Sequence, residues 1–587
     1  MSTTTAGWLQ FALLVAALAA CYVPLGNYIA HIFTTDKDWR IERGIYRVIG
    51  VDRKADQKWS VYLRSILAFS FISVLFLYGI QRLQSYLPYH QHLPGVTPDT
   101  AWNTAASFVT NTNWQNYAGE ATMGYVTQMS GLVVQQFMSA AVGLVVAIAM
   151  IRGFTRSRTD KLGNFWVDVT RCVIRLLIPL SIVGGLILIA GGAIDNFNAY
   201  HTVTTLSGAH QTIVGGPVGS SEWIKDMGNN GGGWFNTNSA HPFENPNPLT
   251  NWFEIFALLL IPFATPRAFG RMVKDNRQGY ALVAVMGTIW AAAVGGISYF
   301  ESHTSLGGAA TVLAGHAAEG TEVRFGAPAC SLFAASTTVT STGAVNCFHD
   351  SLTPFGGGIA LFDIALGEIA PGGIGAGMYG ILILAVVTVF VAGLMVGRTP
   401  EYIGKKIRPQ EMKYAALYFL TLPVLVLTAA GLSIGTHIGQ DAIFNPGYHG
   451  LTEIVYAFAS EANNNGSAFA GLGKVGEDHG QPQDDHDRPV ERRLGVLEDR
   501  GVEGQQRADL DHEHDRVLDL DPRVQLLERV RRRLEEHPRV EQATPDPALR
   551  HGRSALCLGC RCYSHLSAVL RRTGPARGRG SRSGRPG

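Results

Sequence analysis

Charged residues are scarce in this 587-residue chain: Asp, Glu, Lys and Arg make up 16% of it, against a usual share of about 25%. Hydrophobic residues make up 47% and gather in long runs. This combination excludes an ordinary soluble domain and indicates a polytopic membrane protein. A formal net charge of +2 argues against a nucleic-acid partner. The seven cysteines stand at scattered positions and predict no disulfide framework.

Motifs for ATP hydrolysis are also missing. The chain has no phosphorylation motif of the DKTGT type and no P-loop of the form G-x-x-x-x-G-K-[ST]. We therefore expect that it does not hydrolyse ATP by itself, and we expect no organic cofactor.

Eight apolar runs approach the ~20 residues that a bilayer-spanning helix needs. They cover about Trp8–Ala30, Val61–Ile80, Val126–Ile151, Val173–Ile194, Trp252–Ala264, Tyr280–Tyr299, Tyr379–Val396 and Ala415–Leu432. The fifth run is short and is predicted to be broken by proline. Clusters of Lys and Arg follow the first, third, fifth and seventh runs, and few basic residues follow the others. The positive-inside rule then predicts a multi-pass protein in a lipid bilayer with its N-terminus outside.

Four polar segments rich in Gly, Asn, Ser and Thr lie between these runs, all on the predicted outer side. They are SFVTNTNWQNYAGE (107–120), DMGNNGGGWFNTNSAHPFENP (226–246), SLFAASTTVTSTG (331–343) and EIVYAFASEANNNGSAFAG (453–471). Irregular backbone at membrane depth is tolerated where it lines a water-filled cavity or is buried in protein. One such segment alone is more simply a solvated loop. Four of them, about 110 to 125 residues apart, favour four pore loops around one axis.

The expected fold is therefore an all-α polytopic membrane protein. It has four pseudo-repeats of helix, pore loop and helix around a central, potassium-channel-like pore, and the fourth repeat is incomplete. Residues 1–60 form the first span and a basic cytoplasmic loop. The repeats are expected at 61–151, 170–268, 279–397 and 412–472, and an aberrant tail at 473–587.

Backbone carbonyl rings can replace the hydration shell of K⁺, which makes the turn of each polar segment a candidate ion site. The candidate donors are Thr110, Asn111, Thr112, Asn113, Asn230, Gly231, Gly232, Gly233, Ser341, Thr342, Gly343, Ala344, Asn464, Asn465, Gly466 and Ser467. Gln115 follows the first turn, where its side-chain amide either adds an oxygen or bonds to the loop itself.

Several neighbouring residues have two interpretations. Glu120, Glu244 and Glu461 either attract cations at the outer mouth or accept hydrogen bonds within their loops. His349, Asp350 and Cys347 suggest a metal site or, more simply, a hydrogen-bonded turn. The glycine-rich stretches 356–358 and 372–377 are predicted to be flexible linkers.

Four motifs make the chain resemble a known family. TNTNWQ (110–115), NGGGWFNTNSAHPFENP (230–246), TSTGAVNCFHDSLTPFGG (340–357) and EANNNGSAFAGL (461–472) are similar to those of the KdpA family, the potassium-binding subunits of the bacterial Kdp importer. The best-matched positions are Gln115, Gly232, Gly343 and Gly466. The resemblance implies ten spans and K⁺ as bound substrate in the bacterial plasma (inner) membrane. It also implies a P-type ATPase catalytic partner, which hydrolyses ATP, and small single-span accessory subunits. A stand-alone potassium channel and an ion-coupled potassium symporter remain alternatives.

The composition changes abruptly after Leu472. From residue 474 to 587 there is no Phe or Trp, Tyr563 is the only Tyr, and no apolar run could form another span. Our hypothesis is a frameshift near codons 472–474, which makes the Arg-rich tail out of frame and disordered and the chain as written a non-functional truncated product. The alternatives are a cytoplasmic tail, a metal module on Cys557, Cys560 and Cys562, and a charged amphipathic helix over 524–534.

Overall fold

The computed structural model describes residues 3–303, 319–443, 445 and 447–469. The chain divides into a unit from Met1 to Glu477 and a second unit from Asp478 to Gly587. The predicted tail, with its cysteines and its candidate helix, lies outside the described residues.

Eight helices in the described part are long and apolar enough to cross a membrane, which confirms the eight predicted spans. They are α1 (Thr3–Thr34), α3 (Trp59–Arg82), η2 with α6 (Thr127–Val133 and Val134–Thr155), α7 with η3 and α8 (Phe165–Arg171, Cys172–Leu177 and Ile178–Ala190), α10 (Pro248–Met272), α11 (Asn276–Ser302), α15 (Ala376–Met395) and α16 (Pro409–Ile434). The fold is therefore a mostly helical, multi-pass membrane protein.

Helix α10 corrects the prediction of a short, proline-broken fifth span. It runs without interruption through Pro262 and Pro266 and is largely buried. A proline removes the N–H that would bond to the carbonyl four residues earlier, so Leu258 O and Pro262 O lose their helical donors. Both accept other donors: Asn229 Nδ2 lies 2.8 Å from Leu258 O, and Thr265 Oγ1 lies 2.8 Å from Pro262 O. The helix stays continuous because these side chains satisfy the freed carbonyls.

Four shorter helices each pack against the long helix that precedes them in the chain. Helix α4 packs on α3, α9 on α8, α13 on α11, and α18 on α16. Their bounds are Pro98–Thr110, Val218–Met227, Gly326–Val339 and Tyr448–Ala462. Each ends where one of the four polar segments turns. The same pairing of a long helix with a short one thus occurs four times along the described chain.

The glycine-rich stretches do not form flexible linkers as predicted. Gly356–Gly358 lie within helix α14 (Pro354–Leu366), which begins with Pro354 after the Thr353 side chain accepts a hydrogen bond from Gly356 N. The stretch 372–377 forms a close-packed turn between α14 and α15. A Cβ on Gly377 would lie 1.6 Å from the carbonyl oxygen of Pro371, so this turn requires glycine.

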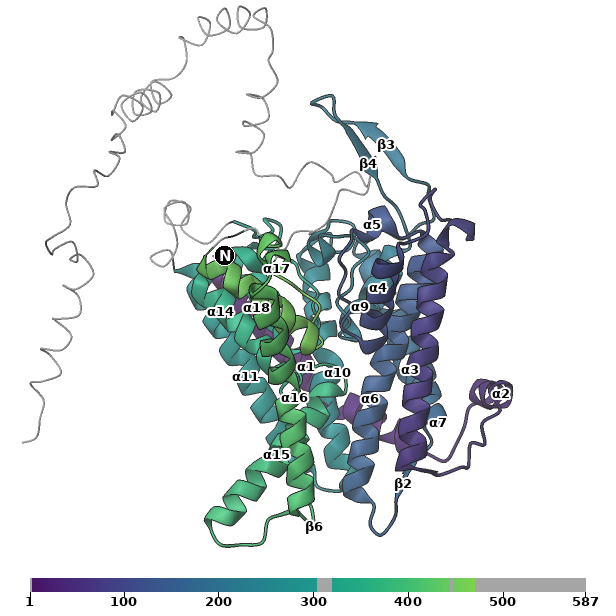
Figure 1. Cartoon of the computed structure of the whole chain (residues 1–587), viewed down its shortest axis with the longest axis vertical. Helices are drawn as coiled ribbons and strands as arrows, with labels where there is room; N and C mark the ends of the chain where they lie inside the picture. The colour runs from purple at the N-terminus through teal and green to yellow at the C-terminus, as the bar shows by residue number, and fades with distance from the viewer. Residues whose placement is uncertain (1–2, 304–318, 444, 446, 470–587) are drawn as a thin grey trace, which may run out of the picture. The chain divides into compact units, whose positions relative to one another are not determined.

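Small elements complete the two ends of the helical bundle. They are the helices α2 (Arg40–Val48), α5 (Gly119–Thr122) and α17 (His437–Asp441), the turns η1 (Gln84–Tyr86), η4 (Asn238–Ala240) and η6 (His349–Ser351), and the strands β1 (Gln57–Lys58), β2 (Lys161–Gly163), β3 (His201–Thr204), β4 (His210–Ile213), β5 (Glu401–Tyr402) and β6 (Lys405–Lys406). The strands pair antiparallel as β1 with β2, β3 with β4, and β5 with β6. The β3–β4 hairpin projects from one end, and β2 and β6 lie at the other (Figure 1).

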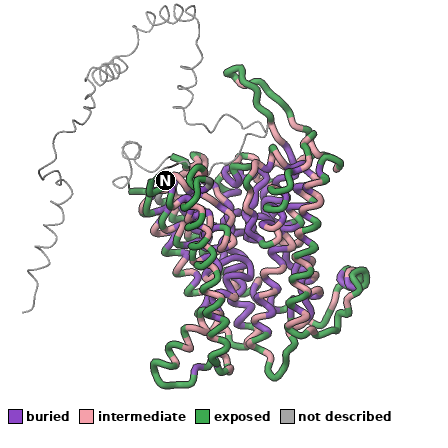
Figure 2. Tube along the Cα trace, in the orientation of Figure 1, coloured by how far each residue is buried: buried purple, intermediate pink, exposed green. Residues whose placement is uncertain are grey.

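Burial is concentrated in the middle of the bundle, as Figure 2 shows. The main core joins buried side chains of α1, α6, α8, α10, α11, α13 and α15. Large apolar side chains also point outward from the bundle, among them Phe71 and Ile72 of α3 and Leu420 and Leu427 of α16. An apolar outer surface is what the hydrocarbon of a bilayer favours.

Candidate functional site

The four polar segments share one backbone conformation. In each, a residue with positive φ follows the short helix, and a second follows two residues later. The pairs are Asn111 and Asn113, Asn229 and Gly231, Ser341 and Gly343, and Asn464 and Gly466. The amide between each pair donates to the carbonyl oxygen five residues earlier: Thr112 to Ser107, Asn230 to Lys225, Thr342 to Thr337, and Asn465 to Ser460, over 2.8 to 3.0 Å. The four turns therefore have equivalent positions, although their sequences barely match.

The turns contact one another in a closed order, and we call residues 111–114, 229–232, 341–344 and 464–467 the loop ring. Three neighbouring pairs are joined by a side-chain hydrogen bond between ring residues, and the fourth turn bonds to Thr337 of α13, the short helix that leads into the third turn. The junctions are Asn111 Nδ2 to Asn229 O at 2.8 Å, Asn229 Nδ2 to Thr342 Oγ1 at 2.9 Å, Asn465 Nδ2 to Thr337 O at 3.3 Å, and Thr112 Oγ1 to Asn464 Oδ1 at 2.6 Å. The ring joins segments up to 352 residues apart.

Close backbone approach explains the glycine at the second positive-φ position of three turns. A Cβ on Gly231 would lie 2.0 Å from Thr342 O, one on Gly343 would lie 1.9 Å from Asn465 O, and one on Gly466 would lie 2.0 Å from Thr112 O. Glycine also adopts positive φ without the steric strain that other residues incur there.

The residues at equivalent positions in the four turns differ slightly from the sets of candidate K⁺ ligands that the sequence predicts. The third and fourth sets, 341–344 and 464–467, coincide with the ring. Thr110 is the last residue of α4, and Gly233 lies just beyond the equivalent part of the second turn. Asn229 and Trp114 occupy ring positions that the sequence sets omitted. Asn229 carries two of the ring's contacts, and its only sequence signal is its place two residues after the end of a short helix.

The carbonyl groups of the three consecutive glycines Gly231, Gly232 and Gly233 also accept side-chain hydrogen bonds. Asn238 Nδ2 donates to Gly231 O at 2.7 Å, and Gln136 Nε2 donates to Gly232 O at 2.9 Å. Gln115 Nε2 lies 3.2 Å from Gly233 O and 3.4 Å from the Tyr117 hydroxyl. Gln115 thus bonds through its amide nitrogen to the neighbouring second segment, and its amide oxygen takes part in neither contact. Each carbonyl oxygen retains a second lone pair for another partner.

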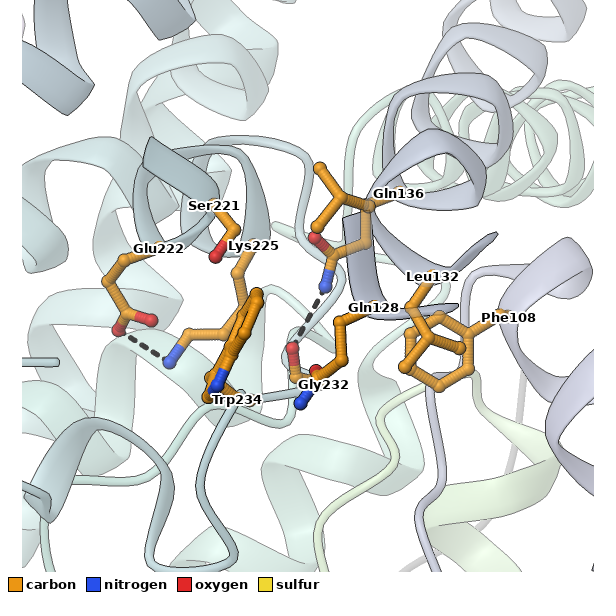
Figure 3. A pocket seen from close by; sticks show the side chains of 11 residues that line it. Phe108, Gln128, Leu132, Gln136, Ser221, Glu222, Lys225, Gly232 and Trp234 are labelled. Carbon is orange, nitrogen blue, oxygen red and sulfur yellow. Dashed lines mark hydrogen bonds and ion pairs between the residues drawn. The ribbon is translucent and has the colours of Figure 1, made fainter. Parts of the chain in front are cut away.

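A buried lysine is linked to the second turn through hydrogen bonds. Lys225 is 1% exposed, and its Nζ donates to Asn238 Oδ1, Ser239 Oγ and Glu244 Oε2 over 2.8 to 3.0 Å. It also forms an ion pair with Glu222 (Figure 3). Because Asn238 in turn bonds to Gly231 O, the ammonium group is coupled to the loop ring through one side chain.

A cavity of about 10 Å³ lies between Lys225 and the second turn, and Figure 3 shows the side chains that line it. It is lined by Phe108, Gln128, Leu132, Val133, Gln136, Ser221, Glu222, Lys225, Gly232, Gly233 and Trp234. That volume is about the minimum that holds one water molecule. The polar groups around it suit a water that bridges Glu222 and the loop backbone.

The acidic residues near the turns have different surroundings. Glu244 is buried, accepts from Phe235 N at 2.7 Å and pairs with Lys225, so it structures its loop. Glu120 Oε2 accepts from Asn236 N at 2.9 Å, which also joins two of the polar segments. Glu461 is exposed at the end of α18.

Two further carboxylates are fully buried. Asp226 on α9 and Glu254 on α10 are both 0% exposed, and neither has a hydrogen-bond partner within the described part of the chain. An oxygen of each lies within 4.8 Å of the other and of an oxygen of Glu222. Burial without a partner disfavours the charged form of both carboxylates.

An imidazole stacks on an aromatic ring in the second polar segment. The ring of His241 stacks on Phe235 with centroids 3.8 Å apart and planes 5° apart. Burial lowers the pKa of His241 below its ordinary value; Arg324 acts in the same direction and Glu244 opposes it. The neutral ring suits an aromatic stack in a buried loop.

One cysteine pair corrects the expectation that the chain has no disulfide. Cys330 on α13 and Cys347 are joined by a disulfide bond across the third turn. The His349 Nδ1 atom lies 2.9 Å from the Tyr456 hydroxyl, which is 3.0 Å from Ser467 Oγ in the loop ring. Cys347 is therefore unavailable as a thiolate ligand, and His349 belongs to a hydrogen-bonded turn, the simpler of its two interpretations.

Comparison with known proteins identifies the family to which this chain is similar. The sequence profile of the family described as "KdpA: Potassium-transporting ATPase A subunit" matches residues 12–477. A potassium-transporting ATPase potassium-binding subunit of Mycolicibacterium smegmatis is 58% identical over 475 residues, which are 80% of this chain and 85% of that protein. The protein of the same name from Kineococcus radiotolerans is 54% identical over 472 residues, 80% and 84% of the two chains. Among solved structures, the potassium transporter TrkH from Vibrio parahaemolyticus aligns with a TM-score of 0.45 at 15% identity, over 69% of this chain and 77% of that one.

Proposed function

This chain belongs to the KdpA family of potassium-transporting ATPase A subunits, and on that premise we propose that it is the potassium-binding and potassium-translocating subunit of an ATP-driven, high-affinity potassium importer. K⁺ enters from outside through the loop ring and passes to a P-type ATPase partner subunit, which hydrolyses ATP. K⁺ is the bound substrate, and the proposal needs no organic cofactor in this chain.

The observation that carries this proposal is the closed loop ring. The four turns have positive φ at equivalent positions and the same internal hydrogen bond, and backbone carbonyl groups are the ligands that K⁺ selection requires. Each turn follows the C-terminal end of a short helix, whose partial negative charge favours a cation. We propose the carbonyl groups of the loop ring as the K⁺ ligands. Thr110 and Gly233, at the margins of the predicted sets, are placed beside these ligands.

The architecture that we propose for potassium translocation is four pseudo-repeats of helix, pore loop and helix around one pore. The fourfold pairing of a long helix with a short one supports it. The repeats are taken as residues 61–151, 170–268, 279–397 and 412–472 after a leading segment of 1–60. In the described residues the fourth repeat has its long helix and its short helix, and no further long helix follows.

The proposed setting is the bacterial inner membrane, with the N-terminus and all four turns outside. The distribution of Lys and Arg between the spans supports this orientation. A catalytic P-type ATPase subunit and small single-span accessory subunits are the proposed partners. Catalysis of ATP hydrolysis is assigned to the partner because this chain has no motif for it.

We also propose that a frameshift near codons 472–474 produced the tail at 473–587. The family profile ends at residue 477, and the matched part covers 85% of the Mycolicibacterium smegmatis relative. A missing closing helix would expose fourth-turn backbone to lipid, at a cost of several kcal/mol for each unpaired group. The chain as written is then a damaged subunit, and one inserted or deleted base would give a frame-restored protein.

Resequencing the gene across the codons for Gly471 to Gly476 is the first test. The second expresses the chain as written and the frame-restored protein, each with its ATPase partner, in a strain that has no other potassium uptake. We expect growth at low K⁺ and K⁺-stimulated ATP hydrolysis with the frame-restored protein alone. Normal uptake by the chain as written would contradict the frameshift proposal.

The same strain separates the proposed function from its alternatives. If the frame-restored protein sustains K⁺ uptake without any ATPase partner, it is a stand-alone channel or a symporter. Replacement of Gly343 by Asp should abolish K⁺-stimulated hydrolysis while the subunits still copurify, because a Cβ at this position would lie 1.9 Å from the Asn465 carbonyl oxygen. Retained K⁺ stimulation in that variant would exclude the loop ring as the ion site.

A further inference from the structure

A second set of ligand-type side chains lies apart from the loop ring, where η6 meets α18. Asp350, His449 and Glu453 each place one ligand atom within 4.8 Å of the others. His449 Nε2 lies 2.7 Å from Asp350 Oδ1 and 3.9 Å from Glu453 Oε1. One imidazole and two carboxylates thus converge on a common point from two elements about 100 residues apart in the chain.

Asn445 occupies the space between the two carboxylates. Its Nδ2 lies 2.6 Å from Glu453 Oε1 and 3.2 Å from Asp350 Oδ2. An amide nitrogen shared by two carboxylates stands where a cation would neutralise both. A half-turn of the amide group exchanges nitrogen for oxygen at the same place. Asn445 can therefore serve as a fourth, oxygen ligand.

The surroundings of Glu453 point independently to a missing cation. The residue is 0% exposed, and its Oε2 atom has no hydrogen-bond partner among the residues that the structure describes. Within those residues, His449 is also the sole ion-pair partner of Asp350 and Glu453. A neutral imidazole leaves two carboxylates uncompensated, one of them buried, and such a charge is strongly unfavourable without a partner. His449 is 42% exposed in its side chain, so the site can be reached from solvent.

We propose that Asp350, His449 and Glu453, with Asn445 as fourth ligand, bind a divalent transition-metal cation. Imidazole nitrogen combined with carboxylate oxygen is a donor set that suits Zn²⁺, whose usual coordination number of four matches the four side chains. K⁺ and Mg²⁺ prefer all-oxygen sites, so the imidazole separates this site from the proposed K⁺ ligands. The proposal does not depend on the proposed transport function.

A metal at this site would fasten two elements that lead to the loop ring. Turn η6 begins two residues after the disulfide residue Cys347 and six residues after the end of the third polar segment. Helix α18 carries Glu453 and, one turn later, Tyr456, whose hydroxyl contacts Ser467 of the ring. The cation would hold the third and fourth turns in their relative positions from the proposed outer side.

The test is Zn²⁺ binding to the purified full chain by isothermal titration calorimetry, at constant K⁺. All proteins carry Cys557→Ser, Cys560→Ser and Cys562→Ser, which removes tail thiols that could bind zinc. We expect the His449→Ala and Glu453→Gln proteins each to bind one Zn²⁺ per chain fewer than the parent, or to bind Zn²⁺ at this site at least tenfold more weakly. His437→Ala, an exposed histidine of the neighbouring α17, is the matched control and should bind as the parent does.

Glu453→Gln keeps the shape of the side chain, so its Zn²⁺ binding tests the proposal if His449→Ala does not fold. Zinc-edge X-ray absorption of the parent should show nitrogen and oxygen ligands, with the imidazole contribution reduced in His449→Ala. Equal Zn²⁺ binding by the parent, His449→Ala and Glu453→Gln would overturn the proposal. So would the absence of saturable binding in the parent protein.

Discussion

The carbonyl oxygen of Thr112 lies 2.0 Å from the position that a Cβ on Gly466 would occupy, although 354 residues separate the two in the chain. This contact closes the loop ring between its first and last turns. Gly466 also has a φ of +90°, so both its conformation and its surroundings exclude a side chain.

Replacing Gly466 with Ala should therefore destabilise the chain and remove K⁺ binding in the frame-restored protein. A positive φ alone costs an ordinary L-residue about 1–2 kcal/mol, and the collision with Thr112 O adds to that. Thermal unfolding and K⁺ titration of the purified protein measure both effects. Gly404→Ala is the matched control, because Gly404 has a φ of +72° but no described atom within 4 Å of a Cβ. An equal loss in both variants would show that strain, and not the ring contact, matters.

Lys225→Met should be strongly destabilising. The change leaves Glu222 and Glu244 buried without their cation and frees the Asn238 side chain that holds Gly231 O. Breaking a buried ion pair by removing one partner costs about 3–5 kcal/mol. The measurement is the thermal unfolding midpoint, with Lys413→Met, an exposed lysine of α16, as control. Adding Glu222→Gln to Lys225→Met should recover part of the stability, and failure to do so would argue against a charge effect.

Asp226→Asn and Glu254→Gln should have the opposite effect. Both carboxylates are buried, and neither has a partner within the described residues, so a neutral amide of the same shape removes an unfavourable charge. We expect unfolding midpoints equal to or above that of the parent. Glu244→Gln is the control. Glu244 is buried with two partners, so this substitution should destabilise the protein. A marked loss of stability in Asp226→Asn would contradict this prediction, because it would show that the Asp226 carboxylate stabilises the folded protein.

Pro262→Ala should separate stability from ion binding. The new N–H of residue 262 would compete for Leu258 O, which Asn229 Nδ2 now occupies. Alanine is favoured over proline inside a helix by about 3 kcal/mol, so the helix itself should not weaken. In the frame-restored protein we therefore expect weaker K⁺ binding without a lower unfolding midpoint.

Pro266→Ala is the matched control for that experiment. The carbonyl freed by Pro266 bonds to Thr265 within the same helix, so no ring residue loses a contact. K⁺ binding should stay near the parental value. Equal effects of the two substitutions would exclude a role for the Asn229 contact.

Reduction of the Cys330–Cys347 disulfide should lower the unfolding midpoint. A cross-link that closes a loop of about this length stabilises by about 3 kcal/mol through the entropy of the unfolded chain. Thiol labelling under non-reducing conditions should leave both cysteines unmodified, and treatment with a reductant should expose them. Cys21→Ser is the control for the unfolding midpoint, because it removes a cysteine of α1 that forms no disulfide. Labelling of Cys330 without reductant would show that the bond is absent in the isolated protein.

The sequence by itself determined the eight spans, the four polar segments and the family. Hydropathy is a local property, since about 20 consecutive apolar residues define a span whatever surrounds them. The third and fourth sets of ring residues also followed from sequence, because a Gly in each marks the turn. The motifs were specific enough to indicate the family before any contact was known.

Only the tertiary structure decided the positions that depend on distant partners. Asn229 enters the ring because it bonds Thr342 and the carbonyl that Pro262 frees, and neither partner is near it in sequence. For the same reason α10 remains continuous through two prolines that, read locally, predict a break. The disulfide and the Asp350–His449–Glu453 cluster likewise join residues that no local pattern connects. Apolar length is a property of consecutive residues, whereas hydrogen-bond satisfaction, close packing and ligand geometry belong to residues that folding alone brings together.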